Sequence, residues 1–186
     1  SGIYNSALLA RDMVQKKCRI EVIDSQTISM SYGLLAMAAA REAIVGAGLS
    51  RVAEMVRRSI QQMHILFLVD TLKYVVRGGR ISRTTGMLGS VLGVKPLLTM
   101  KEGHLTLSTI ARTRAKAIER LYDFARNCPR IKEAAVPYTT VRDEAEALAA
   151  RLRSAFPAAP VHVARVGPAL GTHAGPGAMG VVVREG

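Results

Sequence analysis

The sequence predicts an α/β fold, and three observations lead to that class. Segments with apolar residues at helical spacing alternate along the chain with short runs that are typical of strands. One such run, residues 65–69 (ILFLV), is apolar without interruption, as in a strand buried on both faces of a sheet. A short turn that contains glycine, residues 101–103 (KEG), separates two other strand-like runs and favours a β-hairpin. Helices packed on a mixed sheet are therefore expected.

The first part of the chain is expected to contain three helices and two strands. The first helix can begin at a Ser1 or Asn5 cap, and the first strand (RIEVID) ends at the polar turn Asp24-Ser25. Gly48 separates the second and third helices, with Ser50 as the cap of the third. The predicted order is a helix at 4–17, a strand at 19–24, helices at 31–47 and 50–62, and a strand at 65–69.

The middle of the chain begins with a short predicted helix, residues 72–77, which Asp70 or Thr71 can cap and Gly78-Gly79 can end. Residues 81–93 follow, in which Gly86, Gly89 and Gly93 recur at helix-like intervals beside apolar residues. Because glycine costs stability inside a helix, this pattern indicates that something approaches the backbone closely. Tight helix packing and the wall of an apolar ligand cavity are both compatible with it.

The last part of the chain has the alternation expected of an α/β layer on a mixed sheet. Pro129 ends its first helix, and a glycine-rich connection precedes its last strand. The predicted elements are hairpin strands at 95–100 and 104–108, a helix at 112–127, a strand at 134–138, a helix at 143–154, a strand at 161–166, a connection at 167–180 and a strand at 181–184.

Composition limits the classes of protein that the chain can represent. The 186 residues are 49% hydrophobic, enough for one sizeable core, and no apolar run reaches the roughly 20 residues of a membrane-spanning helix. The two cysteines, Cys18 and Cys128, are far apart and have no metal-type partner nearby, which favours neither a disulfide framework nor a zinc site. A protein of the reducing cytoplasm is expected.

The formal charge of +12 raises the question of nucleic-acid binding. The basic residues are scattered over several segments, and aromatic residues are only 4% of the chain. The interleaving of basic and aromatic residues that is typical of single-strand binders is absent. A solvated, arginine-rich surface is the preferred interpretation, and no nucleic-acid partner is predicted.

Motifs of common enzymes are also absent. The sequence has no P-loop, paired-glycine dinucleotide fingerprint, nucleophile elbow or His-x-x-x-His pair, and no metal site is predicted. Residues 171–178 (GTHAGPGA) can bring backbone N–H groups, a hydroxyl and an imidazole to one anion, although a plain strand connection would have the same composition. Ser1-Gly2, at the start of a helix, offers a second anion site or an ordinary cap.

Five segments in the same order resemble the motifs of DegV proteins, and together they extend over nearly the whole chain. They are Ser1-Gly2-Ile3-Tyr4-Asn5-Ser6-Ala7, Val22-Ile23-Asp24-Ser25, Asp70-Thr71-Leu72-Lys73-Tyr74 with Gly78-Gly79-Arg80-Ile81, Lys95-Pro96-Leu97-Leu98, and Gly171-Thr172-His173-Ala174-Gly175-Pro176-Gly177-Ala178.

The resemblance implies a two-domain α/β fold with one long-chain fatty acid held between the domains. Residues 1–69 would be the remainder of an incomplete N-terminal α/β domain, and residues 70–186 a C-terminal mixed-sheet domain with the Gly-rich segment. The family members are cytoplasmic carriers of phospholipid metabolism, with at most transient membrane contact. They are not enzymes and use no cofactor; they present the fatty acid carboxylate to the catalytic subunit of a separate, ATP-dependent fatty acid kinase.

Site residues follow from the resemblance position by position. Ser1 resembles the carboxylate-binding serine and His173 the histidine near the head group, with Gly2 and Thr172 beside them. Two further groups are expected, a tunnel wall at Ile81, Met87, Leu88 and Leu92, and a kinase-docking pair at Arg80 and Arg112.

Two points qualify this prediction. The family has a further N-terminal segment with a first strand and a second carboxylate-binding hydroxyl, so the chain is expected to be truncated. The alternative function is a small-molecule phosphotransferase that uses residues 171–177 to bind phosphate.

Overall fold

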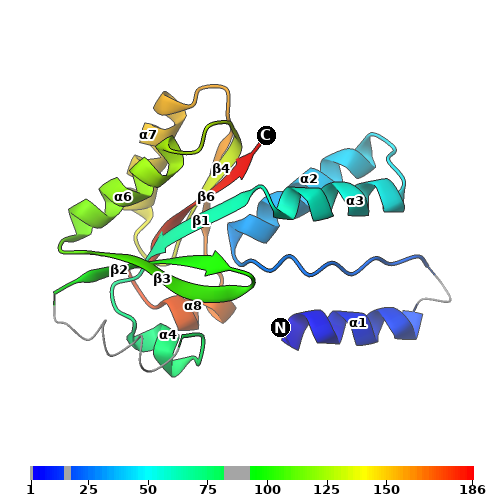
Figure 1. Ribbon diagram of the computed structural model, residues 1–186, viewed down its shortest axis with the longest axis horizontal. Coiled ribbons are helices and arrows are strands. Elements are labelled where there is room, and N and C mark those ends of the chain that lie inside the picture. Colours follow the sequence, from blue (N-terminus) through cyan, green and yellow to red (C-terminus); the bar gives the residue numbers. More distant parts are fainter. Residues whose placement is uncertain (1, 15–17, 82–92) are drawn as a thin grey trace.

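A computed structural model of the protein, which describes residues 2–14, 18–81 and 93–186, has a six-stranded mixed sheet at its centre (Figure 1). The strand order is β3-β2-β1-β6-β4-β5. Every neighbouring pair is antiparallel except β4 and β5, which are parallel, so the predicted α/β class with a mixed sheet is confirmed. The strands are β1 (Met63–Leu68), β2 (Lys95–Lys101), β3 (His104–Ala111), β4 (Ile131–Tyr138), β5 (Val161–Arg165) and β6 (Met179–Glu185).

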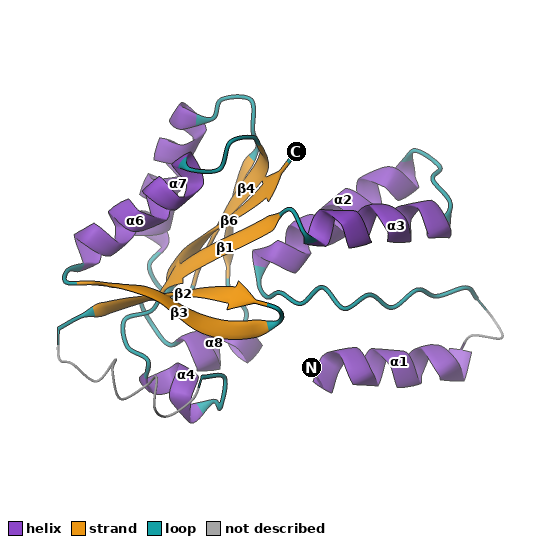
Figure 2. Ribbon diagram, viewed as in Figure 1, coloured by secondary structure: helices purple, strands orange, loops and turns teal. Residues whose placement is uncertain are grey.

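Helices cover both faces of this sheet (Figures 1 and 2). Two long helices, α6 and α7, pack on one face, whereas α2 packs on the opposite face and α3 packs on α2. The short helices α4 and α8 pack on each other at one end of the sheet. The helices in the described residues are α1 (Gly2–Val14), α2 (Met30–Ile44), α3 (Leu49–Ile60), α4 (Lys73–Arg77), α6 (Arg114–Arg126), α7 (Arg142–Ala155) and α8 (Pro168–Ala174).

The two faces of the sheet bury different sets of residues because side chains alternate along each strand. On β6, Val181 and Val183 belong to the large core under α6 and α7. Val182 points the other way and joins Leu34 of α2 and Ala135 of β4. The central strands are therefore apolar on both faces, as the uninterrupted apolar run of β1 predicts.

Local sequence signals place two turns as expected. The two residues that join β2 to β3, Glu102 and Gly103, have φ angles of 50° and 76°, which is the positive-φ geometry of a tight hairpin turn. Gly79, with φ of 67°, ends α4 while its N–H donates to the carbonyl of Val76 at 3.0 Å. Both the hairpin and the glycine end of the short helix are confirmed.

Two predictions are wrong. Residues 19–24 form no strand; they run as an extended segment from α1 to α2, since a strand requires the backbone hydrogen bonds of a neighbour. The predicted connection at 167–180 contains α8, which begins after Gly167 with Pro168 in its first turn and ends at Gly175. Proline at the start and glycine at the end are common at the two ends of a helix. The high glycine content of this segment favours a loop equally well, so the helix is not evident from the sequence.

The predicted domain boundary at residues 69 and 70 stays a prediction. Strand β1, which that boundary assigns to the N-terminal part, is hydrogen-bonded between β2 and β6 of the C-terminal part. Helix α1 has no buried residue and lies apart from the sheet in Figure 1. No helix within the described residues is long and apolar enough to cross a membrane.

Candidate functional site

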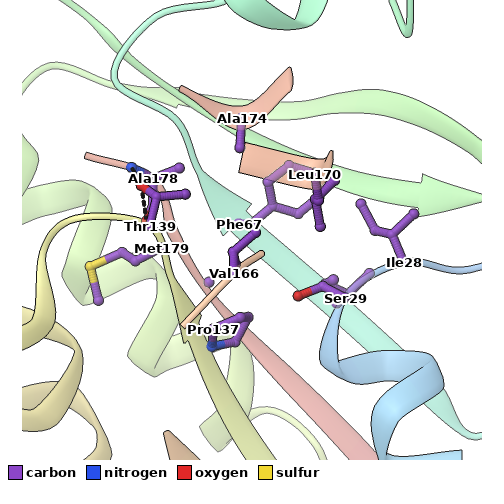
Figure 3. A pocket seen from close by; sticks show the side chains of 12 residues that line it. Ile28, Ser29, Phe67, Pro137, Thr139, Val166, Leu170, Ala174, Ala178 and Met179 are labelled. Atoms are coloured by element: carbon purple, nitrogen blue, oxygen red, sulfur yellow. Dashed lines mark hydrogen bonds between the residues drawn. The ribbon is translucent and has the colours of Figure 1, made fainter. Parts of the chain in front are cut away.

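An apolar cavity of about 40 Å³ lies on the α2 face of the sheet, between the sheet, the segment that enters α2, and α8. Figure 3 shows its side chains converging from these elements, with Phe67 and Leu170 close together near the middle. The lining residues are Ile28, Ser29, Ile65, Phe67, Pro137, Thr139, Val166, Leu170, Ala174, Ala178, Met179 and Gly180.

Gly180 allows the sheet to form one wall of this cavity. A Cβ atom at this position would lie 2.7 Å from Cβ of Phe67 and 2.9 Å from the carbonyl oxygen of Leu66. Glycine inside a strand often indicates such a close approach. Without a side chain on β6 at this position, Phe67 of the neighbouring β1 can lie across the sheet and line the cavity.

Few polar side-chain atoms face the cavity. The Thr139 hydroxyl already has protein partners, because it accepts from the N–H of Ala178 at 3.1 Å and donates to the carbonyl of the same residue at 3.2 Å. Ser29 is the second residue with a hydroxyl in the lining. The cavity thus suits a hydrocarbon chain far better than a charged metabolite.

The wall at α8 is interlocked with the segment around α4. Idealised Cβ atoms on Gly175 and Gly177 would lie 2.3 Å from the Tyr74 ring and 2.5 Å from Oδ2 of Asp70. A Cβ on Gly78 would in turn lie 2.0 Å from Nδ1 of His173. Each glycine therefore makes room for a side chain of the opposite segment. The Gly-rich sequence is a close-packed junction between the α4 and α8 segments.

A cluster of charged groups holds this junction in place. Asp70 accepts from Lys95 and from Arg114, both at 2.9 Å to its Oδ1, and Arg114 also donates to both carboxylate oxygens of Glu144. The hydrogen bonds to Glu144 raise the pKa of Arg114 above its ordinary value, although partial burial acts in the opposite direction. The arginine is charged at every physiological pH and ties α6 to α7 and to the segment after β1.

The backbone N–H groups of Gly175 and Gly177 are not free to bind an anion, because they have partners inside the protein. The N–H of Gly177 donates to the Thr140 hydroxyl at 2.9 Å, and that of Gly175 donates to the carbonyl of Gly171 at 2.8 Å. Asp70 also places a carboxylate beside Gly177, which disfavours an anion there. This geometry does not support a phosphate-binding loop.

The predicted head-group residues have different surroundings. His173 lies against Gly78, and its Nδ1 is buried without a hydrogen-bond partner among the described residues. Thr172 is exposed and donates to the carbonyl of Ala169 at 3.2 Å. Gly2 is the exposed first residue of α1, and the described hydrogen bonds do not join it to His173 or Thr172. Ser1 lies outside the described residues.

Of the predicted tunnel-wall residues, only Ile81 lies within the part of the chain that the structure describes. Ile81 is partly buried and packs against the cluster that contains Val69, Leu72 and Val75. Three further predicted tunnel-wall residues, Met87, Leu88 and Leu92, lie outside the described residues.

The predicted docking residues Arg80 and Arg112 are both exposed. Arg80 follows the end of α4 and donates to the carbonyl of Gly78 at 2.6 Å. Arg112 lies between β3 and α6.

The sequence did not identify most of the cavity. Ile28, Phe67, Pro137 and Leu170 come from four separate segments, and only the fold brings them together. Gly180 gave one usable signal, because it interrupts an apolar strand pattern where a close approach is common.

A family model and a relative of similar sequence both match this chain over its whole length. The family model described as an uncharacterised protein of the DegV family matches residues 1–186. A DegV domain-containing protein of Caldanaerobacter subterraneus subsp. tengcongensis is 37% identical over 188 residues, covering 100% of this chain and 67% of that protein.

Two solved structures share the fold. A DegV family protein from Thermus thermophilus, reported as binding fatty acid, is 30% identical with a TM-score of 0.88. DegV of Bacillus subtilis, reported as a fatty acid binding protein, is 28% identical with a TM-score of 0.87. In each case 100% of this chain aligns with 67% of the other. The chain thus spans about two thirds of the length of these proteins.

Proposed function

Since the chain belongs to the DegV family, we propose that it binds one long-chain fatty acid and holds a segment of the acyl chain in the cavity between the sheet, the segment that enters α2, and α8. The observation that carries this proposal is the apolar lining of that cavity. The fatty acid binding reported for the relatives from Thermus thermophilus and Bacillus subtilis supports it.

The cavity accounts for one part of the ligand. Its volume of about 40 Å³ accommodates only a short stretch of an acyl chain, so other surfaces must cover the remainder. Each buried CH₂ group contributes about 0.8 kcal/mol to binding, and most of the affinity therefore comes from the hydrocarbon. The carboxylate is assigned to Ser1, Gly2, Thr172 and His173, by their resemblance to the family motifs. A buried carboxylate needs several such donors.

The bound fatty acid is presented to another protein and is not transformed by the carrier. The acceptor would be the catalytic subunit of a fatty acid kinase, which forms the acyl phosphate. This assignment rests on the family resemblance. Arg80 and Arg112 support it, because both are exposed and can reach an acidic partner surface.

Lipid extraction and native mass spectrometry of the purified full-length protein test the binding proposal directly. One fatty acid per protein chain is the expected result. Protein without bound lipid that also fails to take up added oleate or palmitate would contradict the proposal.

Filling the cavity should weaken fatty acid binding. Val166→Phe adds an aromatic ring to a residue that lines the cavity. The affinity for a fluorescent fatty acid is expected to fall at least about tenfold, because the ring would occupy the space of several acyl carbons. The same substitution at exposed Val45 is the matched control and should leave the affinity unchanged. Unaltered binding by a folded Val166→Phe protein would remove the cavity from the ligand site.

Reversing the charge of Arg80 should separate binding from presentation. Arg80→Glu is expected to leave the lipid content unchanged and to lower acyl-phosphate formation by the kinase about tenfold or more, because a desolvated interface charge pair is lost. A reconstituted kinase assay measures this effect. Glu102→Lys, an exposed charge reversal in the β2–β3 turn, serves as the control. Equal rates for Arg80→Glu and the wild-type protein would eliminate Arg80 from the docking surface.

A further inference from the structure

An open groove of about 630 Å³ lies outside the carboxyl ends of the two parallel strands, β4 and β5. Thr139 and Thr140 follow β4, and Arg165 is the last residue of β5. Residues of α8 and of the turns before and after it complete the walls. The groove therefore has the size that is common for small-molecule sites in proteins.

The connections of the sheet place this groove where open α/β sheets usually bind ligands. The chain leaves β4 for α7, which packs on the face that carries the large core. It leaves the neighbouring β5 for α8, which covers the cavity on the opposite face. The two connections separate at the strand ends, and ligands of open α/β sheets bind in the crevice at such a point.

Arg165 supplies a positive charge to the groove. It is exposed, and its side chain makes no ion pair or hydrogen bond within the described residues. By contrast, Arg114 of α6 and Arg151 of α7 both pair with glutamates. Because a guanidinium group binds phosphate and carboxylate groups through two parallel hydrogen bonds, an anion is the ligand that suits Arg165.

The hydroxyl of Thr140 adds a second donor to the groove. Its Oγ1 accepts from the N–H of Gly177 at 2.9 Å, and its own proton has no acceptor in the described part of the chain. The Thr139 hydroxyl is already paired with both polar backbone atoms of Ala178. Threonine hydroxyls and arginine side chains are both common partners of phosphate oxygens.

The other charged groups at this end of the sheet compensate one another. The carboxylates of Asp70 and Glu144 are balanced by Lys95 and Arg114. At the start of α7, one basic residue is followed directly by an acidic one. Arg165 therefore determines the sign of the potential in the groove, which is positive.

We propose that this groove binds a small organic phosphate monoester. Its phosphate group pairs with Arg165 and accepts from the Thr140 hydroxyl, and its organic part lies on Val166, Pro168 and Pro176. Phosphate suits the two donors better than carboxylate does, since it carries more charge and a third acceptor oxygen. The site goes beyond the proposed fatty acid binding, although the groove shares two lining residues with the apolar cavity.

Isothermal titration calorimetry of the full-length protein with phenyl phosphate, benzoate and phenol tests the site. Phenyl phosphate should bind most tightly. Arg165→Gln should weaken its binding about 10- to 100-fold, because hydrogen bonds to a charged group are lost. The control is Arg130→Gln, which removes an exposed arginine before the opposite end of β4 and should leave the affinity unchanged.

A matched pair of glycine variants tests the position of the site. Gly167 precedes α8 with φ of −68° and ψ of 163°, and Gly48 precedes α3 with φ of −69° and ψ of 158°. No atom lies within 4 Å of either idealised Cβ, and aspartate is favoured before a helix, so both aspartate variants should fold. Only Gly167→Asp adds a carboxylate to the groove, and it should weaken phenyl phosphate binding at least about tenfold.

Several results would overturn the proposal. They are the absence of phenyl phosphate binding up to about 10 mM, equal affinity for phenol, wild-type affinity in Arg165→Gln, and equal losses in Gly167→Asp and Gly48→Asp. Tighter binding of benzoate than of phenyl phosphate would overturn the phosphate class. None of these results alters the lipid content of the protein, so the proposed fatty acid binding is tested separately.

Discussion

Gly175→Ala is expected to lower the free energy of unfolding by about 2 to 5 kcal/mol, among the largest effects of any single methyl group in this protein. Gly175 has φ of 76° and ψ of 176°, a backbone conformation that is essentially restricted to glycine. The added Cβ would also lie 2.3 Å from Cδ2 of Tyr74, an aromatic ring held in the junction between α4 and α8. Backbone strain and overpacking therefore add to each other.

Urea denaturation of Gly175→Ala and Gly79→Ala compares a glycine whose added Cβ would meet a side chain with one whose Cβ would meet nothing. Gly79 has a similar φ of 67°, but no atom lies within 4 Å of its idealised Cβ. Its substitution should cost only the conformational term, about 1 to 2 kcal/mol. Equal losses in the two variants would show that Tyr74 moves aside freely and that the junction is not closely packed.

The same junction should couple stability to ligand binding. Gly175 directly follows Ala174, which lines the cavity, and α8 also carries Leu170. A displacement of α8 away from Tyr74 would therefore change the cavity wall. We expect Gly175→Ala to weaken fatty acid binding even at temperatures where the variant remains folded.

Local signals in the sequence were sufficient for most elements of this fold. The hairpin between β2 and β3 was predictable because a glycine turn between two strand-like runs is decided within a few residues. The uninterrupted apolar residues of β1 predict a strand that is buried on both faces, and β1 indeed lies inside the sheet. The local sequence is therefore sufficient to predict these elements, without knowledge of contacts between distant residues.

Elements that depend on partners were predicted less well. Residues 19–24 have the alternation of a strand, but a strand is stabilised by its neighbours, and the described chain places none beside them. Helix α8 is hard to predict because the proline and glycine at its two ends are equally typical of a loop. Composition is ambiguous where the same residues can cap a helix or form a turn.

The candidate site was predictable only where it coincides with a motif. Family resemblance singled out residues 171–178, of which Ala174 and Ala178 line the cavity. Ile28, Phe67 and Leu170 belong to no recognisable motif, because they are ordinary apolar residues of three segments. Their shared role arises from tertiary packing.

Glu133→Ala is expected to destabilise the protein by about 3 to 5 kcal/mol, because it would leave a buried arginine without its counter-charge. Glu133 is 1% exposed and Arg184 is 5% exposed, and Nε of Arg184 donates to Oε1 of Glu133 at 2.7 Å. Arg41 of α2 donates to Oε2 of the same carboxylate at 3.0 Å. The pair thus joins β4 to β6 and ties α2 to the face of the sheet that carries the cavity.

Chemical denaturation of two further variants tests this explanation. Glu54→Ala removes an exposed partner of Arg58 on α3, and its effect should stay within about 1 kcal/mol, as is usual for surface pairs. The double variant Glu133→Leu with Arg184→Met should recover most of the loss, because it removes both buried charges and fills their space with apolar atoms. In that variant Arg41 can turn to solvent, since its side chain is already 50% exposed. If the double variant is as unstable as Glu133→Ala, an unpaired Arg184 charge is not the cause, and the stability must come from the packing of Glu133 itself.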